Sequence, residues 1–208
     1  MPAEFGNSVF INCPFDKEYE PILQAILFCV VSAGLFPRIA TEAADAAEVR
    51  LLKIQNLILK SRFSIHDLSR IQARSQGEYF RLNMPFELGL DYGCRTFAGE
   101  EYASKRMLIL ETKPYRYQAA ISDLAGCDIQ SHGDQFQQAV RKVRNWLVSE
   151  ANLQMPGATG VLNAYTDFQE WYYERQLAAG FSDDDIQDYP TSELLEAMVE
   201  WRDLGKPI

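Results

Sequence analysis

The sequence predicts an α/β protein with a doubly wound, mostly parallel sheet of five strands and a C-terminal helical appendage. Three observations favour this class. Short apolar runs alternate with helical patterns through the first 150 residues, which is typical of consecutive β-α-β units. Several of the apolar runs end in polar residues. The chain of 208 residues, 47% hydrophobic and 24% charged, can also bury one substantial core.

Strand and helix patterns follow one another in order along this first part of the chain. Short apolar runs predict strands, and apolar residues that recur every three or four positions predict helices. The predicted strands are Ser8–Asn12, Phe36–Ala40, Arg62–His66, Arg106–Glu111 and a short fifth within 126–131. The predicted helices are Tyr19–Ala33, Glu48–Leu59, Phe86–Arg95 and Gln135–Ser149. With right-handed crossovers, this order places a ligand crevice at the carboxyl ends of the strands.

A change in composition near residue 150 divides the chain into a predicted α/β domain, 1–150, and an acidic helical appendage, 151–208. Residues 1–150 hold 17 Lys and Arg against 18 Asp and Glu, and residues 151–208 hold 3 against 11, so the net charges are −1 and −8. A break at 155–160 precedes two predicted helices, 164–179 and 192–204, and Asp183–Asp185 is predicted to be a helix N-terminal cap. The predicted packing residues of the appendage are Trp171, Tyr172, Leu177, Leu194, Leu195, Met198, Val199 and Trp201.

Composition also narrows the classes of partner. The net charge of −9 disfavours a nucleic-acid surface, because such a surface needs a basic excess on some face. The local exception is a group of four arginines at 62, 70, 74 and 81. No apolar run is long enough to span a bilayer and the first residues do not resemble a signal peptide, so we expect a cytoplasmic protein without membrane contact.

Thiols and histidines offer little material for a metal site or a nucleophilic triad. The four cysteines lie far apart and form no Cys-x-x-Cys pair, so neither a disulfide nor a zinc site is expected. The chain has two histidines, His66 and His132. We expect His66 to be a partly buried strand residue, and a Ser-His-Asp triad is not favoured.

The stretch from Asn83 to Gly93 is the most informative part of the sequence for function. Pro85 suits the first turn of a helix, with Asn83 or Met84 as its cap, and Glu87 is then predicted in that first turn. A carboxylate there can simply favour the start of a helix. Alternatively, Glu87 faces the ligand crevice that the predicted sheet creates at this end, and Asn83 is among the residues expected to contact the substrate there.

Polar residues follow the other predicted strands at the same edge of the sheet. The turn after the first strand holds Asn12, Pro14, Phe15 and Asp16, in which the aromatic ring could stack on a base. Arg38 follows from the second strand, and either it or Arg70 could hold a phosphate. The alternatives are an ordinary Asx turn and surface ion pairs.

The third predicted strand leads into an acid, a hydroxyl and a guanidinium. These groups belong to Asp67, Ser69 and Arg70, which together could orient a ribose and grip a phosphate. A helix cap or a surface ion pair is the alternative. A glycine-rich turn is absent after the first strand, which excludes P-loop and dinucleotide Rossmann proteins.

Three segments together resemble the prokaryotic TIR-like families, which are related in fold to nucleoside 2-deoxyribosyltransferases. The segments are Val9–Asp16, Ile65–Arg70 and Asn83–Gly89, and the likeness covers about the first 150 residues. It implies a flavodoxin-like, five-stranded parallel sheet and a catalytic role for Glu87. It also implies that Asn12, Pro14, Phe15 and Asp16 contact a nucleotide.

The resemblance implies an N-glycosidase that cleaves or cyclises NAD⁺ or a related nucleotide, as antiphage-defence members do. NAD⁺ would be the substrate, with no separate cofactor, and Asp67 would fix the ribose or act as the partner acid or base. The other expected partners are a second copy of the chain or a sensor protein. A noncatalytic nucleotide-sensing or protein-interaction module of the same fold is the alternative.

Overall fold

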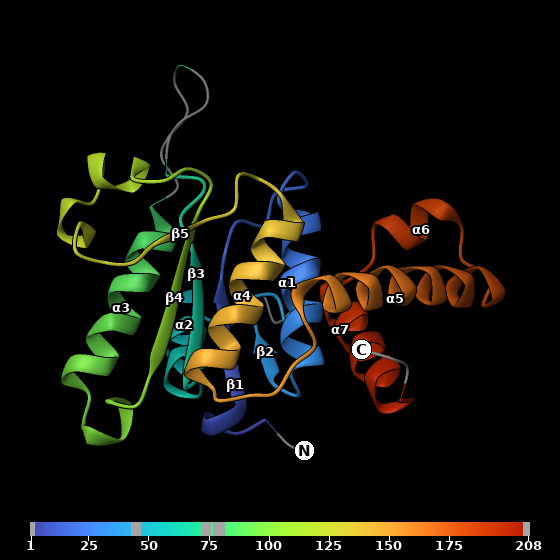
Figure 1. Ribbon diagram of the computed structural model, residues 1–208, viewed down its shortest axis with the longest axis horizontal. Coiled ribbons are helices and arrows are strands. Elements are labelled where there is room, and N and C mark those ends of the chain that lie inside the picture. Colours follow the sequence, from blue (N-terminus) through green and yellow to red (C-terminus); the bar gives the residue numbers. More distant parts are fainter. Residues whose placement is uncertain (1–2, 43–46, 72–75, 77–81, 206–208) are drawn as a thin grey trace.

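Five parallel strands form one sheet in the computed structural model, which describes residues 3–42, 47–71, 76 and 82–205 (Figure 1). The strands are β1 Ser8–Asn12, β2 Phe36–Arg38, β3 Phe63–Asp67, β4 Arg106–Glu111 and β5 Gln130–Ser131. Their order across the sheet is β2-β1-β3-β4-β5, and every neighbouring pair is parallel. The predicted flavodoxin-like α/β fold is therefore confirmed.

Helices cover both faces of this sheet. The α-helices are α1 Glu20–Ser32, α2 Arg50–Leu59, α3 Asn83–Phe97, α4 Phe136–Glu150, α5 Ala158–Ala178, α6 Asp183–Gln187 and α7 Thr191–Asp203. Short 3₁₀ turns are η1 Phe5–Asn7, η2 Glu100–Tyr102, η3 Arg116–Ala119 and η4 Ser122–Leu124. Helices α1 and α4 lie on one face, and α2 and α3 lie on the other (Figure 1).

Alternation along the strands assigns side chains to the two faces. Val9 and Ile11 of β1 pack in the same core cluster as α1 and α4, whereas Phe10 packs against α2. The same alternation holds in β3, where Ile65 joins the α1 side. The next residue of each strand, Asn12 in β1 and His66 in β3, therefore points toward α3.

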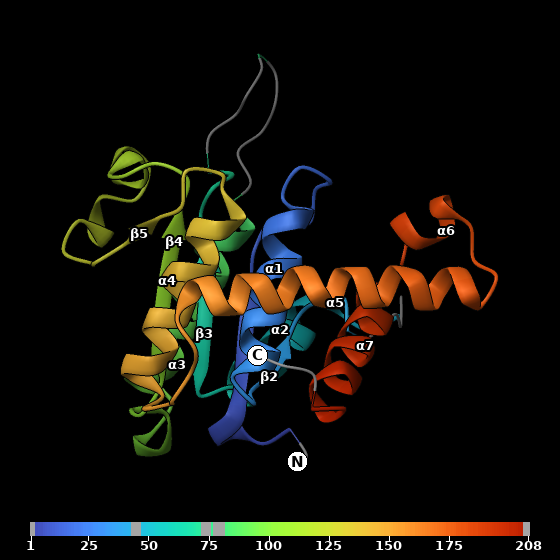
Figure 2. The same cartoon turned by 45° about the vertical axis from the view of Figure 1, so that its right-hand side comes forward.

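Helix α1 is apolar on every side because it is covered on both sides. One side faces the sheet, and α5 and α7 cover the other (Figure 2). The ring of Phe28 lies 5.3 Å from Tyr165, 5.4 Å from Phe168 and 5.5 Å from Trp201, measured between ring centroids. The C-terminal helices thus form a third layer that shares one core with the sheet.

Several predicted boundaries differ from the structure. Helix α5 begins at Ala158, inside the predicted break, and Gly160 suits this turn because a Cβ there would lie 3.2 Å from the Cβ of Pro156. Leu177 was predicted to pack but is 44% exposed near the end of that helix. The cap predicted at 183–185 lies one residue earlier, because Ser182 is the N-cap of α6 and its hydroxyl accepts a hydrogen bond from the Asp185 N–H.

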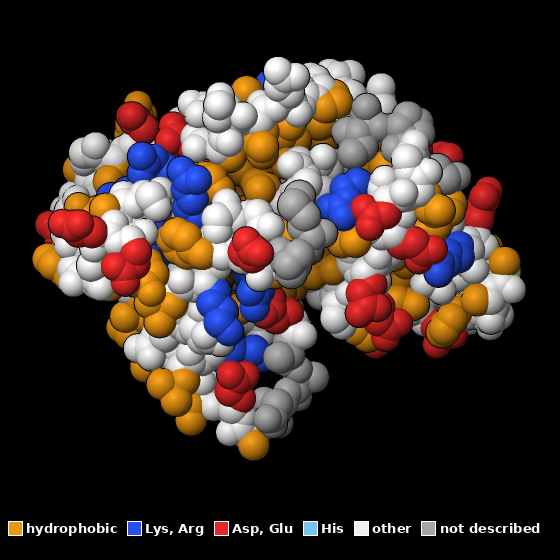
Figure 3. Space-filling model, turned by 90° about the horizontal axis from the view of Figure 1, so that it is seen from below, with side chains coloured by type: hydrophobic (Ala, Val, Ile, Leu, Met, Phe, Trp, Pro, Cys, Tyr) orange, Lys and Arg blue, Asp and Glu red, His pale blue; other side chains and the backbone are white. Residues whose placement is uncertain are grey.

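None of the helices among the described residues is long and apolar enough to cross a bilayer. Seen from the amino ends of the strands, Lys and Arg side chains are interspersed with Asp and Glu (Figure 3). Arg62 and Arg70 of the predicted basic group are described, while Arg74 and Arg81 lie outside the described residues.

Candidate functional site

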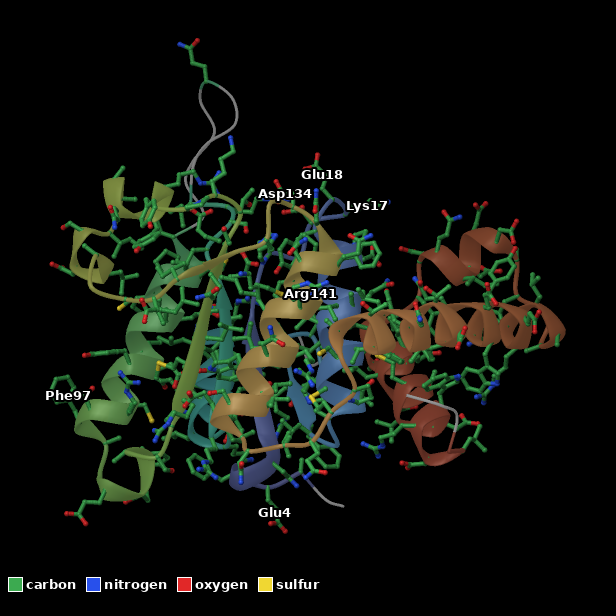
Figure 4. All side chains as sticks on the ribbon, viewed as in Figure 1. Glu4, Lys17, Glu18, Phe97, Asp134 and Arg141 are labelled. Carbon is green, nitrogen blue, oxygen red and sulfur yellow. The ribbon has the colours of Figure 1, made fainter. Side chains whose placement is uncertain are left out.

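The candidate site lies at the carboxyl ends of β1 and β3, where the strand order reverses. In sheets of this order, ligands bind at that switch point. Figure 4 shows Lys17, Glu18 and Asp134 at this edge of the molecule and Glu4 at the opposite edge. The turn 13–19, the residues after β3 and the start of α3 meet here.

Asn12, the last residue of β1, joins three elements of the site. Its side-chain Nδ2 donates to the carbonyl oxygen of Met84 at 2.9 Å and lies 3.0 Å from Nδ1 of His66. Because the Met84 carbonyl can only accept, it fixes which end of the amide faces the histidine. Asn12 thus clamps the first turn of α3 against β1 and β3, and the amide itself is 3% exposed.

The clamp continues into a buried polar chain. Since Nδ1 of His66 accepts from Asn12, its Nε2 carries the hydrogen and donates to Asp91 Oδ2 at 2.9 Å. Asp91 Oδ1 lies 3.1 Å from Lys105 Nζ, and all three side chains are fully buried. The Lys105 ammonium also donates to the carbonyl oxygens of Ile58 and Ser61. The chain ties α3 to β3, to the start of β4 and to the end of α2.

The hydrogen bonds and the ion pair in this series set the charge of Asp91. Burial alone would raise the pKa of the Asp91 carboxyl, but the hydrogen bond from His66 and the charge of Lys105 hold that pKa below its ordinary value. Asp91 is therefore a carboxylate paired with a buried ammonium. His66 was expected to be partly buried, and the structure corrects this, because the ring is enclosed between Asn12, Phe10 and α3.

Asp67, at the end of β3, holds a second buried cluster. Its Oδ2 accepts from the Tyr19 hydroxyl at 2.6 Å and lies 3.0 Å from His132 Nε2, while Oδ1 accepts from the Ser69 N–H at 2.8 Å. Burial would raise the pKa of Asp67, but the hydrogen bonds from His132, Ser69 and Tyr19 hold it below its ordinary value. The carboxylate is fully enclosed, so in this structure it positions its neighbours and does not face a ligand.

Ser69, His132 and Asp67 lie together but do not form a catalytic triad. The Ser69 hydroxyl lies 3.0 Å from His132 Nε2, the same nitrogen that contacts Asp67. The other ring nitrogen, Nδ1, accepts from the backbone N–H of Asp134 at 3.1 Å. Nε2 therefore carries the hydrogen and cannot take a proton from Ser69, as a triad histidine must. The expectation against a triad holds in this geometry, although the three residue types meet.

Cys13 marks the middle of the site, because three carboxylates lie around it. Burial raises the pKa of its thiol well above the ordinary value, and the charges of Asp67, Glu87 and Asp16 raise it further. The thiol stays protonated and is 2% exposed, which makes it a packing group. The same electrostatics show that Glu87, Asp67 and Asp16, which are far apart in sequence, converge as predicted.

Glu87 lies one turn further into its helix than predicted. Helix α3 begins at Asn83 after an N-cap at Leu82 with no side-chain cap, so Asn83 and Met84 are not caps and Glu87 is in the second turn. The carboxyl is 7% exposed. Burial raises its pKa above the ordinary value, and the charge of Arg50, 3.9 Å away, opposes that rise. Because Glu87 is not in the first turn, helix initiation does not explain its placement.

The predicted nucleotide-contacting turn is part buried and part open. Asn12 and Pro14 are buried, whereas Phe15 is 42% exposed at the tip of the turn and can offer its ring to solvent. Asn83 is exposed at the start of α3. Of these four residues, Phe15 and Asn83 present surface to a ligand, and Asn12 acts through its clamp.

The two arginines predicted to hold phosphate are both engaged by carboxylates. Arg38 donates to both oxygens of Glu42, from its Nε at 3.1 and 2.9 Å and from Nη2 at 2.6 Å. Arg70 donates to Asp16 at 3.1 and 3.3 Å, and its guanidinium lies 3.7 Å from Glu18 and 3.8 Å from Asp134. Either side chain would have to leave a carboxylate in order to hold a phosphate.

A further ion pair ties the segment after β4 to the site. Arg116 of η3 donates to both carboxylate oxygens of the buried Glu111, with Nε at 3.0 Å from Oε2. Its Nη2 also donates to the backbone carbonyl of Ser69 at 2.8 Å. The carboxyl ends of β3 and β4 are thus held together.

Comparison with known proteins adds no relative. No protein-family model, curated protein or solved structure matches the chain.

Four important residues were not predicted from the sequence: Arg50, Asp91, Lys105 and His132. One signal was available for Asp91, which follows Met84 by seven positions and Glu87 by four and so shares their buried face of α3. An acid on a buried helical face requires a partner. The partner, Lys105, comes from another element and is not readable from spacing.

The free energy of unfolding tests the contribution of the Asn12 clamp. Asn12→Ala leaves the Met84 carbonyl and the His66 Nδ1 buried without their donor, and each such group costs about 1–3 kcal/mol. We expect a correspondingly lower free energy of unfolding in urea. Asn163→Ala, at an exposed position of α5, should change it by no more than about 0.5 kcal/mol. An Asn12 variant as stable as the control would contradict the clamp.

Because Glu87 is buried, replacing its carboxyl group is expected to raise the thermal stability of the protein, by an amount that depends on pH. Because its pKa is raised in the folded chain, the folded state binds this proton more tightly, and stability falls as pH rises from the ordinary Glu pKa of about 4.3 through the folded value. Glu87→Gln does not titrate, so we expect a higher Tm than wild type at pH 7 and a gap that closes near pH 4. The exposed Glu100→Gln should show no such gap. A lower Tm at pH 7 would show that the carboxylate stabilises the fold.

Proposed function

We propose that this chain is an N-glycosidase that cleaves or cyclises NAD⁺ or a related nucleotide, with Glu87 as the catalytic carboxylate. The observation that carries the proposal is the placement of Glu87. It is a nearly buried carboxylate at the switch-point edge of a flavodoxin-like sheet, its pKa is raised by burial, and its ion pair is with one exposed arginine. Perturbed groups of this kind cluster at functional sites.

The chemistry requires little beyond a positioned carboxylate. When the bond between C1′ and the nitrogen of nicotinamide breaks, both electrons leave with the base, and C1′ gains oxocarbenium character. The Glu87 carboxylate can stabilise that charge or trap it covalently. Water then adds its hydroxyl to C1′ and releases a proton, or a nitrogen of the same dinucleotide attacks and closes a ring. The sequence lacks an acid in 79–86, shortly before Glu87, which favours hydrolysis or cyclisation over base exchange.

Other residues of the site support this reaction indirectly. Asn12 fixes the first turn of α3 and hence the place of Glu87. Asp67 holds Tyr19 and the turn at Ser69, so it acts as a positioning residue. Phe15 presents an exposed ring in the turn after β1, where a base can stack on it.

The resemblance to TIR-like families supports a role in antiphage-defence signalling inside the cytoplasm, with a second copy or a sensor protein as regulator. A binding module of the same fold remains the second candidate. It is favoured by the closed ion pairs around Arg70 and Arg116, which hold the edge in one arrangement. Turnover separates the two functions.

Mass spectrometry of the reaction products tests the proposal. Purified chain, dilute and at high concentration, is incubated with NAD⁺, NADP⁺, ATP and deoxynucleotides, and free base and sugar products are followed. We expect base release that increases as Glu87 ionises with rising pH. In Glu87→Gln the rate should fall by at least about 100-fold, because loss of one transition-state contact of this kind costs that much.

The matched control is Glu100→Gln, which removes a carboxylate in η2, beyond the C-terminal end of α3. It should keep the wild-type rate. Base release that survives in Glu87→Gln would refute a catalytic Glu87. Tight nucleotide binding with no turnover at any concentration would assign the chain to the binding class.

A further inference from the structure

We propose that Arg50 binds the phosphate of the substrate, so that the site selects phosphorylated nucleotides over nucleosides. This inference rests on the function proposed above and deepens it. Arg50 is the first residue of α2, and its Nη2 lies 3.9 Å from Oε1 of Glu87. Among the described residues it is the cation within ion-pair distance of the proposed catalytic carboxylate.

The Arg50 guanidinium can bind an incoming anion more easily than the other arginines at this edge of the sheet. It is 58% exposed, and its contact with Glu87 is a long, one-atom ion pair. Arg38, Arg70 and Arg116 instead make short hydrogen bonds to carboxylates. Releasing any of those three would break two or more bonds, whereas Arg50 can turn to an incoming anion at small cost.

The ion pair with Glu87 is not a structural need of the fold. Glu87 is nearly buried, but Arg50 is 58% exposed and the two side chains are 3.9 Å apart, so water at the guanidinium weakens the pair. Arg50 makes no other ion pair among the residues that the structure describes. Arg50 therefore contributes little to the fold, and ligand binding explains its position beside Glu87 better than a structural role does.

The distance suits a nucleotide. A 5′-phosphate lies only a few ångströms from C1′ of the same ribose, so a group that holds the phosphate must stand next to the group that attacks C1′. A guanidinium can form two parallel hydrogen bonds with phosphate oxygens, which fixes the sugar as well as attracting it. Arg50 and Glu87 have this relation through the contact of α2 with α3.

Binding also couples the two residues. In the free chain the charge of Arg50 opposes the burial that raises the pKa of Glu87. A phosphate that draws Arg50 away from Glu87 exchanges one anionic partner of the guanidinium for another. The carboxylate is then released to approach C1′, with its ion pair broken by the substrate itself.

Nicotinamide mononucleotide and nicotinamide riboside give the test, because they differ by one phosphate and share the scissile bond. Their dissociation constants are measured by calorimetry with full-length Glu87→Gln, with and without Arg50→Gln. We expect Glu87→Gln to bind the mononucleotide about 10-fold or more tighter than the riboside, as a charge-assisted hydrogen bond provides. Arg50→Gln should abolish that preference and leave the affinity for the riboside unchanged.

Arg141→Gln is the matched control, since Arg141 is an exposed arginine on α4 (Figure 4). It should keep the preference, and Arg50→Lys should keep part of it. Equal loss of affinity for both compounds in Arg50→Gln, or an unchanged preference, would overturn the phosphate site. So would failure of the chain to bind either compound.

Turnover of the same two compounds separates this inference from the proposed function. Phosphate preference that depends on Arg50, without base release by wild type, would sustain the phosphate site and refute the glycosidase. Base release that depends on Glu87 but is equal for both compounds would sustain the glycosidase and refute the phosphate site.

Discussion

The amide of Asn12 is the contact on which the site depends. A parallel sheet brings the ends of β1 and β3 together, but it does not fix where the next helix begins. The Met84 carbonyl is in the first turn of α3, and by accepting from Asn12 it sets both the position and the rotation of that helix. Glu87 follows three residues later, close to one turn of helix, so the clamp determines where its carboxylate points.

The series of buried contacts from His66 through Asp91 to Lys105 fixes the orientation of the Asn12 amide and of the His66 ring. A histidine that accepts from Asn12 must donate on its other side, and the carboxylate that receives this bond must itself be paired. Burying such groups is costly unless every partner is present. Any other register of α3 would leave some of these buried groups without a partner. The same contacts link the amino end of β4 to the carboxyl end of β1.

The fold was predictable from the sequence because strands and helices have local signatures. The strand at 8–12 and that at 106–111 were predicted to the residue, and the order of helices was correct. The packing of α5 and α7 against the core was not predicted. It follows from α1, whose apolar residues need a cover on the side that faces away from the sheet. The place of Glu87 at the carboxyl edge of the sheet was predicted from its motif, whereas the contacts of Arg50, Lys105 and His132 were not, because their partners come from distant elements. The carboxylate partners of Arg38 and Arg70 were not predicted, since ion pairing depends on neighbours that spacing does not reveal.

A crystal structure of Glu87→Gln with unhydrolysed NAD⁺ would show whether residue 87 faces the scissile bond. We expect C1′ of the nicotinamide ribose to lie about 3–3.5 Å from the side chain of residue 87, the distance of a near-attack arrangement. The base should lie near Phe15. A dinucleotide bound at another edge of the sheet, or bound here with C1′ turned away from residue 87, would contradict this expectation.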